Sequence, residues 1–326
     1  MSRWIASVCA FALIGGLAAS PKVAAAETYP GRPVKIIVPF AAGGPADIYA
    51  RFLAQRLESA LGQPFVVDDR PGAGSLIGTE AAAGSAPDGY TLLLMSNTHT
   101  VNESLLANKP YVLLRDFVPV APINYSDLVL VVNPSVPAKT LRELIALAKA
   151  KPGKLNYASS GTGTPYHMAG ELFKAMAGVD IVHIPYKGSS QARTDTLGGQ
   201  VDMMFDAVTT MGQFAREGKV RALATSGKVR SSVLPDVPTL SEAGVPGYES
   251  VIWLGLIAPK GTPTDIVQRL NAEITRIVSD PQVRAEWAKQ GAVAMTMTPD
   301  EFSSYIVADI AKWEKIVKIS GARTDR

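Results

Sequence analysis

Cysteine is almost absent from this sequence of 326 residues. The single one, Cys9, lies within the first 26 residues, so the remainder of the chain has none. A chain of this kind cannot form an internal disulfide, use a thiolate nucleophile or bind a metal through sulfur. Histidine is also scarce, and His99, His167 and His183 do not have the spacing of a metal-binding pair. We therefore expect neither a metal ion nor another cofactor.

An excess of charge of one sign is missing as well. The chain has 32 Lys and Arg against 29 Asp and Glu, a formal net charge of +3. Arg3 and Lys22 belong to the first 26 residues, and the rest of the chain has 30 basic and 29 acidic residues, a net charge of +1. Proteins that bind nucleic acids or anionic membranes concentrate Lys and Arg to meet phosphates. The balance argues against both of these functions.

The first 26 residues have the features of a secretory signal. Arg3 precedes an apolar stretch, Trp4–Ala19, and Ala24-Ala25-Ala26 forms an A-x-A cleavage site. A membrane anchor needs about 20 consecutive apolar residues, whereas this stretch is shorter and is interrupted by Gly15-Gly16. No later segment is long and apolar enough to span a membrane. We expect cleavage near Ala26 and a soluble periplasmic protein.

After the signal, short apolar runs alternate with helical patterns. Val34–Pro39 predicts a strand buried on both faces. From Asp47 the apolar residues recur at helical spacing until Gly62, so Asp47 is predicted as the N-cap and Gly62 as the stop. The same order returns with strands at Phe65–Asp68 and Thr91–Met95 around a helix near Ser75–Ala83. Parallel strands joined by helices are the simplest interpretation.

The remainder of the chain repeats this alternation, and we predict two α/β lobes, the first completed by the carboxyl-terminal helices. Residues 227–250 are expected to form a long ordered loop. The predicted strands are Asp127–Asn133, Leu155–Ala158, Ile181–Ile184, Val201–Phe205, Val220–Thr225, Val251–Ala258 and one near Ala292–Thr296. The predicted helices are Leu141–Lys151, Pro165–Ala177, 263–279, 281–290 and 299–320.

Two glycine-containing loops, 39–47 and 159–166, each lead from a strand into a helix. The beginning of a helix has unpaired N–H groups and a partial positive charge, and glycine lets an anion approach them closely. Neither loop has a basic residue, and the donors are backbone amides and hydroxyls. If the loops face each other, they would hold an anion at each end, which suits a small dicarboxylate. Alternatively, both are ordinary turns.

Other polar groups could join such a site. Ser96-Asn97-Thr98-His99 follows a predicted strand, and ligands of open parallel sheets gather at strand carboxyl ends; the alternative is a loop that caps itself. His167 could hydrogen-bond the loop or the ligand, or be structural. Asp206 could orient a ligand or cap the next helix. His183, between two apolar residues, is interpreted as structural.

Motifs of common enzyme classes are missing. Residues 72–78 have the spacing G-x-G-x-x-x-G, and the acidic residue that a dinucleotide site needs about 20 residues later is replaced by Met95-Ser96-Asn97. The sequence contains no Walker motif, H-E-x-x-H or G-x-S-x-G. The glycines of this segment are therefore interpreted as structural.

Taken together, long segments of the chain resemble the Bug-type extracytoplasmic solute-binding receptors of tripartite tricarboxylate transporters. The resemblance runs over nearly all of the chain after the signal and includes YPGRPVKIIVPFAAGGPADIYAR at 29–51 and LNYASSGTGTPYHMAGELF at 155–173. Further segments match in family order at 61–94, 182–192, 198–206 and 234–244.

The resemblance implies a two-lobed periplasmic-binding-protein fold of type II, with two crossovers and a cleft between the lobes. Lobe 1 would comprise 27–123 and 254–326, and lobe 2 would comprise 124–253. The ligand-binding residues it implies are Phe40, Ala41, Gly43, Gly44, Asp47, Ser96, Ser159, Ser160, Gly161, Gly163, Thr164, His167 and Asp206. The polar segment after the strand Thr91–Met95 adds Asn97 to this set. The chain departs from the family pattern at Ala207, at Thr210 and at Asn102-Glu103-Ser104, which leaves substrate choice open.

The expected function is capture of a small carboxylate in a closing cleft and its delivery to integral-membrane permease subunits, by a monomer that binds no nucleic acid. A dicarboxylate is preferred, and an aromatic acid is the second possibility because Phe40, His99, Phe205 and Trp253 could line an apolar middle. Two alternatives remain: a secreted α/β enzyme that uses His167 and Asp206, and a receptor that serves a signalling sensor.

Overall fold

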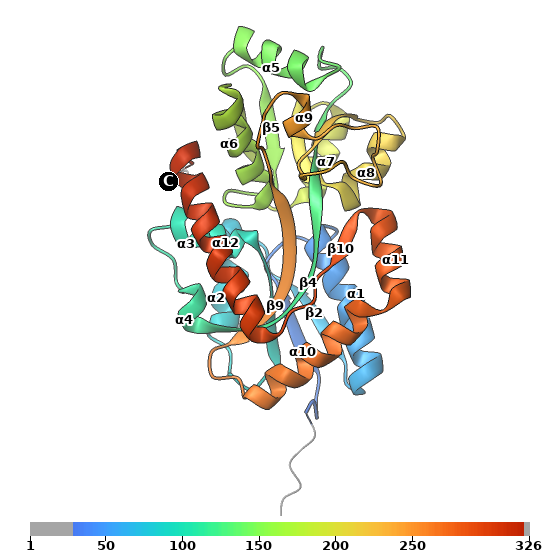
Figure 1. Cartoon of the computed structure of the whole chain (residues 1–326). Coiled ribbons are helices and arrows are strands. Elements are labelled where there is room, and N and C mark those ends of the chain that lie inside the picture. Colours follow the sequence, from blue (N-terminus) through green and yellow to red (C-terminus); the bar gives the residue numbers. More distant parts are fainter. Residues whose placement is uncertain (1–28, 323–326) are drawn as a thin grey trace, which may run out of the picture.

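The computed structural model describes residues 29–322, and the predicted signal at 1–26 lies outside the described residues. Figure 1 shows two groups of strands and helices, connected by two long strands that run through the middle of the molecule. The strands form one mixed sheet in the order β2-β1-β3-β9-β4-β7-β5-β6, with β8 and β10 also paired to β4. Within 29–322, none of the helices combines the length and apolar character needed to cross a membrane.

The first group has the predicted alternation of strands and helices. Strands β1 (Val34–Val38), β2 (Phe65–Asp69) and β3 (Thr91–Ser96) pair in parallel, with β1 in the middle. Their buried residues are mostly Val, Ile and Leu, as expected of parallel strands with both faces covered. The connections contain α1 (Pro45–Leu61), the short 3₁₀ turn η1 (Ala73–Ser75) and α2 (Leu76–Ala83).

Ser96–His99 do not form a loop. Ser96 is the N-cap of α3 (Asn97–Leu105), a helix that the sequence interpretation did not include. A second short helix, α4 (Leu113–Asp116), leads into the following strand. The polar residues after β3 are thus the first turn of a helix, which still places them at the carboxyl end of a parallel strand.

Two long strands connect the groups. β4 (Phe117–Val132) begins well before the predicted Asp127 and pairs antiparallel with β9 (Val251–Pro259) over Phe117–Asp127. Its last residues, Leu128–Val132, pair instead with β7 (Met203–Ala207) and β8 (Arg221–Thr225). One strand therefore belongs to both groups.

The second group again has parallel strands, with β5 (Asn156–Ser159) between β6 (Val182–Pro185) and β7. Helices α5 (Leu141–Ala150) and α6 (Pro165–Ala177) match their predicted ranges closely. Helices α7 (Ser189–Gly198), α8 (Val208–Arg216) and the short α9 (Leu240–Ala243) were not predicted. The last of these lies inside the segment 227–250, which was interpreted as a loop.

The carboxyl-terminal elements are α10 (Thr264–Ser279), α11 (Pro281–Gln290), β10 (Ala292–Ala294) and α12 (Pro299–Ser320). In Figure 1, α12 runs alongside both groups. Its residue Phe302 packs in a cluster with β3 and β9, whereas Trp313 and Ile316 pack with residues of α6 and β7. This helix contacts both predicted lobes, and the division into lobes remains a prediction.

Asp127 occupies a special position where the two long strands pair. It is opposite Val251 in the β4–β9 ladder, and a Cβ atom added to Gly227 would lie 2.5 Å from its Oδ1 atom. Burial, and then the nearby Glu249 carboxylate, raises the pKa of Asp127 to about 6. At neutral pH the folded protein therefore holds an unfavourably buried negative charge between its connecting strands.

We expect Asp127→Asn to stabilise the protein at pH 7. The folded carboxyl binds its proton below about pH 6 and the unfolded one only below about 3.8, so this residue costs stability as the pH rises from 4 to 7. Because Asp127 is partly exposed, we expect a gain of about 1 to 2 kcal/mol in the free energy of unfolding at pH 7 and almost none at pH 4. Urea unfolding at both pH values measures it, with the exposed Asp180→Asn as the control. An equal gain at both pH values would contradict the prediction.

Candidate functional site

The first glycine loop connects β1 to α1. Gly44 is the N-cap and Pro45 is the first residue of the helix, a position where the missing N–H of proline costs no hydrogen bond. Asp47 is therefore in the first turn and is not the predicted N-cap. Its Oδ2 atom accepts the Gly43 N–H at 2.8 Å, and its other oxygen pairs with Arg51. Asp47 thus shapes the loop and is engaged by protein groups.

The segment after β3 is organised around a neutral histidine. The Ser96 hydroxyl accepts the Thr98 N–H at 3.2 Å, and the Ser96 N–H donates to Nδ1 of His99 at 3.2 Å, which completes a capping box. Because Nδ1 accepts, the ring proton belongs on Nε2, which lies 3.0 Å from the Thr79 hydroxyl. Burial lowers the pKa of His99 to about 4, so the ring is uncharged at neutral pH.

Asn97, the second residue of this segment, binds the backbone of β9. Its side-chain amide donates to the Val251 carbonyl at 3.0 Å, and its oxygen accepts the Trp253 N–H at 3.0 Å. Asn97 therefore fixes the start of α3 against one of the two connecting strands, and its polar atoms are used there.

The second glycine loop, between β5 and α6, is held in the same way by its own residues. The Thr164 hydroxyl donates to the Gly161 carbonyl at 2.7 Å, and the Ser159 hydroxyl accepts the Gly161 N–H at 3.1 Å. His167 accepts the Gly163 N–H on Nδ1 at 3.2 Å, and burial lowers its pKa to about 4. The Nδ1 atom of His167 is therefore used in a hydrogen bond with the loop. Ser159 also lies 2.6 Å from Nε2 of His183.

A third loop of the same kind, between β6 and α7, was not predicted as part of the site. Tyr186-Lys187-Gly188 follows β6, Gly188 is the N-cap and Ser189 begins the helix. The sequence signal was available, since a glycine and two serines follow an apolar strand here as well. It was missed because α7 has few apolar residues and therefore lacks a helical hydrophobic pattern.

The beginnings of four helices meet at one small cavity of about 30 Å³. Gly44 and Ala46 come from α1, Ser96 caps α3, Tyr166 is in the first turn of α6 and Ser189 begins α7. None of the described residues that line the cavity is Lys or Arg. Its complete lining is Phe40, Ala41, Gly44, Pro45, Ala46, Ser96, Ser160, Pro165, Tyr166, Gly188, Ser189, Ile252 and Leu254.

A wider cleft of about 430 Å³ adjoins this cavity and shares Phe40 and Ser160 with it. Its walls are the segment 72–75 on one side and Gly161, Thr162 and Thr164 on the other. The exposed Lys187 lies at this cleft. Because they share two lining residues, the cavity and the cleft are considered together as the candidate site.

The predicted binding residues divide into three sets. Phe40, Ala41, Gly44, Ser96 and Ser160 line the cavity, and Gly161 and Thr164 line the adjoining cleft. The lining of neither space includes the remaining seven, which are Gly43, Asp47, Asn97, Ser159, Gly163, His167 and Asp206. Six of these seven take part in the hydrogen bonds described above, which shape the loops; Asp206 is considered next.

Asp206 is fully buried and forms an ion pair with Arg193 of α7, with 2.7 Å between its Oδ2 atom and Nε of the arginine. Its other oxygen accepts the Ala207 N–H at 2.9 Å. In this arrangement the carboxylate acts on Arg193 and on the backbone, so an acid–base role with His167 has no support in the geometry.

The aromatic residues expected to line an apolar middle are only partly at the site. Phe40 lines the cavity, and the His99 ring packs edge-on against it with the ring centres 6.3 Å apart. Phe205 packs between Phe173 and Tyr248, away from the lining. Trp253 contacts Phe302 and donates to Asp309. The apolar surface comes instead from Ile252 and Leu254 of β9.

The loops of the two groups touch each other around the cavity. The Ser190 hydroxyl donates to the Ala42 carbonyl at 2.9 Å. A Cβ atom added to Gly188 would lie 2.6 Å from Cβ of Ala41, and one added to Gly74 would lie 2.8 Å from the Thr162 carbonyl oxygen. These close approaches depend on glycine. Among residues 29–322, no three His, Cys, Asp or Glu side chains gather as a metal site would require.

Comparison with known proteins identifies relatives over the whole chain. The family described as "Tripartite tricarboxylate transporter family receptor" matches residues 49–322. Protein BugT of Bordetella pertussis is 41% identical over 325 residues, which cover 99% of this chain and 99% of that protein.

Solved structures of related proteins have a similar fold. The R. palustris protein Rpa4515 with adipate superposes with a TM-score of 0.88 at 35% identity, covering 90% of this chain and 99% of that one. MatC (Rpa3494) from Rhodopseudomonas palustris with bound malate gives a TM-score of 0.83 at 33% identity, covering 89% and 100%. The mixed α/β fold of this chain is thus that of periplasmic binding proteins.

The neutral His99 generates a prediction about acid stability. Its folded pKa of about 4 lies below the usual 6.5, so acid favours the unfolded state as the pH falls from 6.5 towards 4. His99→Gln keeps a capping-box acceptor without titrating. We expect the variant to lose about 2 kcal/mol less stability than the parent between pH 7 and pH 5. Urea unfolding at the two pH values tests this, and parallel losses in both proteins would contradict it.

Proposed function

Because the chain belongs to the tripartite tricarboxylate transporter receptor family, whose members are non-enzymatic periplasmic binding proteins, we propose that it captures a small dicarboxylate between its loops and delivers it to the permease subunits of such a transporter. The proposal includes export through the segment 1–26 with cleavage near Ala26. It also includes action as a monomer, with lobes 27–123 plus 254–326 and 124–253.

The observation that carries the choice of ligand is the meeting of four helix beginnings at one cavity whose described lining has no Lys or Arg. The start of a helix offers unpaired N–H groups and about half a positive charge. Four of them supply roughly two positive charges, which matches a doubly charged anion. Each of the four helices has at least nine residues, long enough for the backbone dipoles to add.

The cavity, at about 30 Å³, has room for about one water molecule, so a dicarboxylate would also occupy the adjoining cleft of about 430 Å³. Phe40, Ile252 and Leu254 give the cavity apolar walls between the polar helix starts. Related structures hold adipate in one case and malate in another, two dicarboxylates of different length and polarity. Of the aromatic residues considered for an aromatic acid, Phe205 and Trp253 are engaged elsewhere in the core, which favours the aliphatic alternative.

Capture requires the two lobes to open and close. We propose that they move about the paired strands near Ile123–Ser126 and Tyr248–Trp253, where the ladder between β4 and β9 contains irregularities at Pro119–Ala121 and Pro122–Asn124. The contacts of Gly188 with Ala41 and of Ser190 with Ala42 would then belong to the closed form. A ligand favours that form only through the additional contacts it makes there.

A thermal-shift screen with adipate, malate, aspartate, phthalate and citrate tests the function directly, with the monocarboxylate hexanoate for comparison. At about 100 times its dissociation constant, a true ligand adds roughly 2.7 kcal/mol to stability. We expect an aliphatic dicarboxylate to give the largest shift and hexanoate a small one. Mass spectrometry of the recovered ligand should show it unchanged. No shift with any of the acids would refute the proposal, and chemical conversion of the ligand would favour an enzyme.

Substitution of Gly188 tests closure. Its backbone is extended, with φ of −178°, so alanine is accepted without backbone strain, whereas Gly43 and Gly163 have positive φ and any side chain there strains the loop. The new Cβ would collide with Ala41 only when the loops are together. We expect Gly188→Ala to weaken ligand binding at least about 10-fold, or 1.4 kcal/mol, in calorimetry.

The matched control is Gly84→Ala, at an exposed position without positive φ, where the nearest atom is 3.6 Å away. Both variants should keep the melting temperature of the unliganded parent, because the collision arises only in the closed form. If Gly188→Ala binds as tightly as the parent, then closure does not bring residue 188 against Ala41.

A further inference from the structure

The hydroxyl of Tyr166 is buried at the site without a partner. The residue is 3% exposed and lines the cavity at the start of α6, yet no described group is in hydrogen-bond geometry with its Oη atom. Burial raises the pKa of Tyr166 well above the usual value, and the Ser189 side chain opposes this as a weak hydrogen-bond neighbour that does not meet full hydrogen-bond geometry. The hydroxyl therefore stays protonated and is a donor at any physiological pH.

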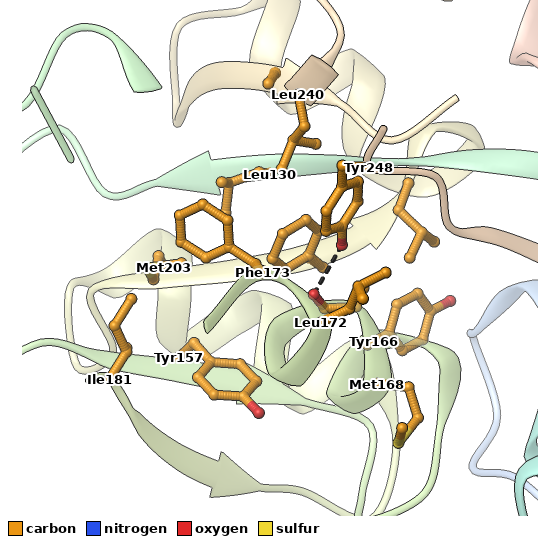
Figure 2. Packing of buried hydrophobic residues seen from close by; sticks show 14 of the residues in the cluster. Leu130, Tyr157, Tyr166, Met168, Leu172, Phe173, Ile181, Met203, Leu240 and Tyr248 are labelled. Atoms are coloured by element: carbon orange, nitrogen blue, oxygen red, sulfur yellow. Dashed lines mark hydrogen bonds between the residues drawn. The ribbon is translucent and has the colours of Figure 1, made fainter. Parts of the chain in front are cut away.

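Other buried tyrosines of the same hydrophobic cluster have partners. The Tyr157 hydroxyl donates to Glu171 at 2.7 Å, and the Tyr248 hydroxyl donates to the Ala169 carbonyl at 2.7 Å. In Figure 2 the Tyr166 hydroxyl points away from these residues, at the edge of the cluster. The hydroxyls of Tyr49 and Tyr111 are also buried without a partner among the described residues, but neither residue lines the cavity. Because buried polar groups in folded proteins are nearly always paired, the Tyr166 hydroxyl beside the cavity is available to an acceptor on the ligand.

The electrostatic surroundings suit an anionic acceptor. Arg193 pairs with Asp206 through Nε only, and its Nη2 atom is buried without a partner. The Tyr166 hydroxyl is influenced by both of these charges. Arg193 and Asp206 lie outside the lining of the cavity and the cleft. Because the ion pair has no net charge, the surroundings of the Tyr166 hydroxyl hold no uncompensated protein anion from this pair.

We propose that Tyr166 is a specificity-determining residue whose hydroxyl donates to the second carboxylate of the ligand. The role of Tyr166 rests on the proposed function of the protein as a dicarboxylate receptor. Backbone amides hold any carboxylate, and they bind a monocarboxylate as well as one end of a dicarboxylate. The Tyr166 hydroxyl adds a hydrogen bond only when the ligand has an acceptor at its other end. Tyr166 thereby selects dicarboxylates over monocarboxylates of the same length.

Tyr166→Phe removes the hydroxyl and leaves the ring that packs in the core. Calorimetry should compare adipate with hexanoate, and malate with 3-hydroxybutyrate, because each pair differs by one carboxylate. In the parent we expect the dicarboxylate of at least one pair to bind tighter. In Tyr166→Phe its affinity should fall about 10-fold while that of the matching monocarboxylate stays within twofold. The ratio of the two affinities is the deciding quantity.

Tyr157→Phe is the matched control, since it removes a buried hydroxyl of the same cluster that donates to Glu171. It should lower the melting temperature and leave the affinity ratio unchanged. If Tyr166→Phe weakens both acids of a pair equally, or neither, then the role of Tyr166 is refuted while the receptor function stands. If no acid binds the parent, the proposed function fails and the role of Tyr166 fails with it.

Discussion

The central constraint on this molecule is the cost of a buried negative charge. An anion that leaves water loses its hydration and needs compensating charge or donors. Proteins often supply Arg or Lys, but none of the described cavity-lining residues is basic. In the proposed function the compensation is instead distributed over the starts of α1, α3, α6 and α7. This solution dictates the fold around the site, because four helices must begin at one point and each must follow a strand or loop that ends there.

A second consequence of this constraint is that the loop backbone has to approach the ligand closely. Backbone amides reach a ligand only when no side chain stands between, so the loops are rich in glycine and their shapes are fixed by internal hydrogen bonds. Asp47 and His167 each accept a backbone N–H of their own loop, and His99 accepts the N–H of the residue that caps its helix. These side chains thus orient the backbone, and in the proposed function the backbone would contact the ligand. Two histidines with lowered pKa values fit this role, because an uncharged ring can accept a hydrogen bond.

The sequence predicts the parts of the fold that depend on local pattern. The strand, loop and helix from Val34 to Leu61 and the helix Pro165–Ala177 follow from hydrophobic periodicity and from glycine and proline signals. Asp47 was misplaced because proline at position 45 starts the helix earlier than its acidic residue suggests. The length of β4 and the existence of α7 depend on tertiary pairing and on polar packing, which leave no periodic signal. Tyr166 has no sequence signal of this kind, whereas Ser189 was missed although a glycine and two serines follow an apolar strand there.

The ion pair of Arg193 and Asp206 explains how a cation can lie near the site without determining what binds. A free guanidinium at the cavity would hold any anion strongly and with little regard for its length. Asp206 cancels that charge and fixes the orientation of the side chain, so at the cavity itself the proposed attraction comes from backbone dipoles and single donors, while Lys187 lies at the adjoining cleft. Each of these is directional and short-ranged. In the proposed function, selection then depends on where the oxygens of the ligand lie. Related structures hold dicarboxylates as different as adipate and malate.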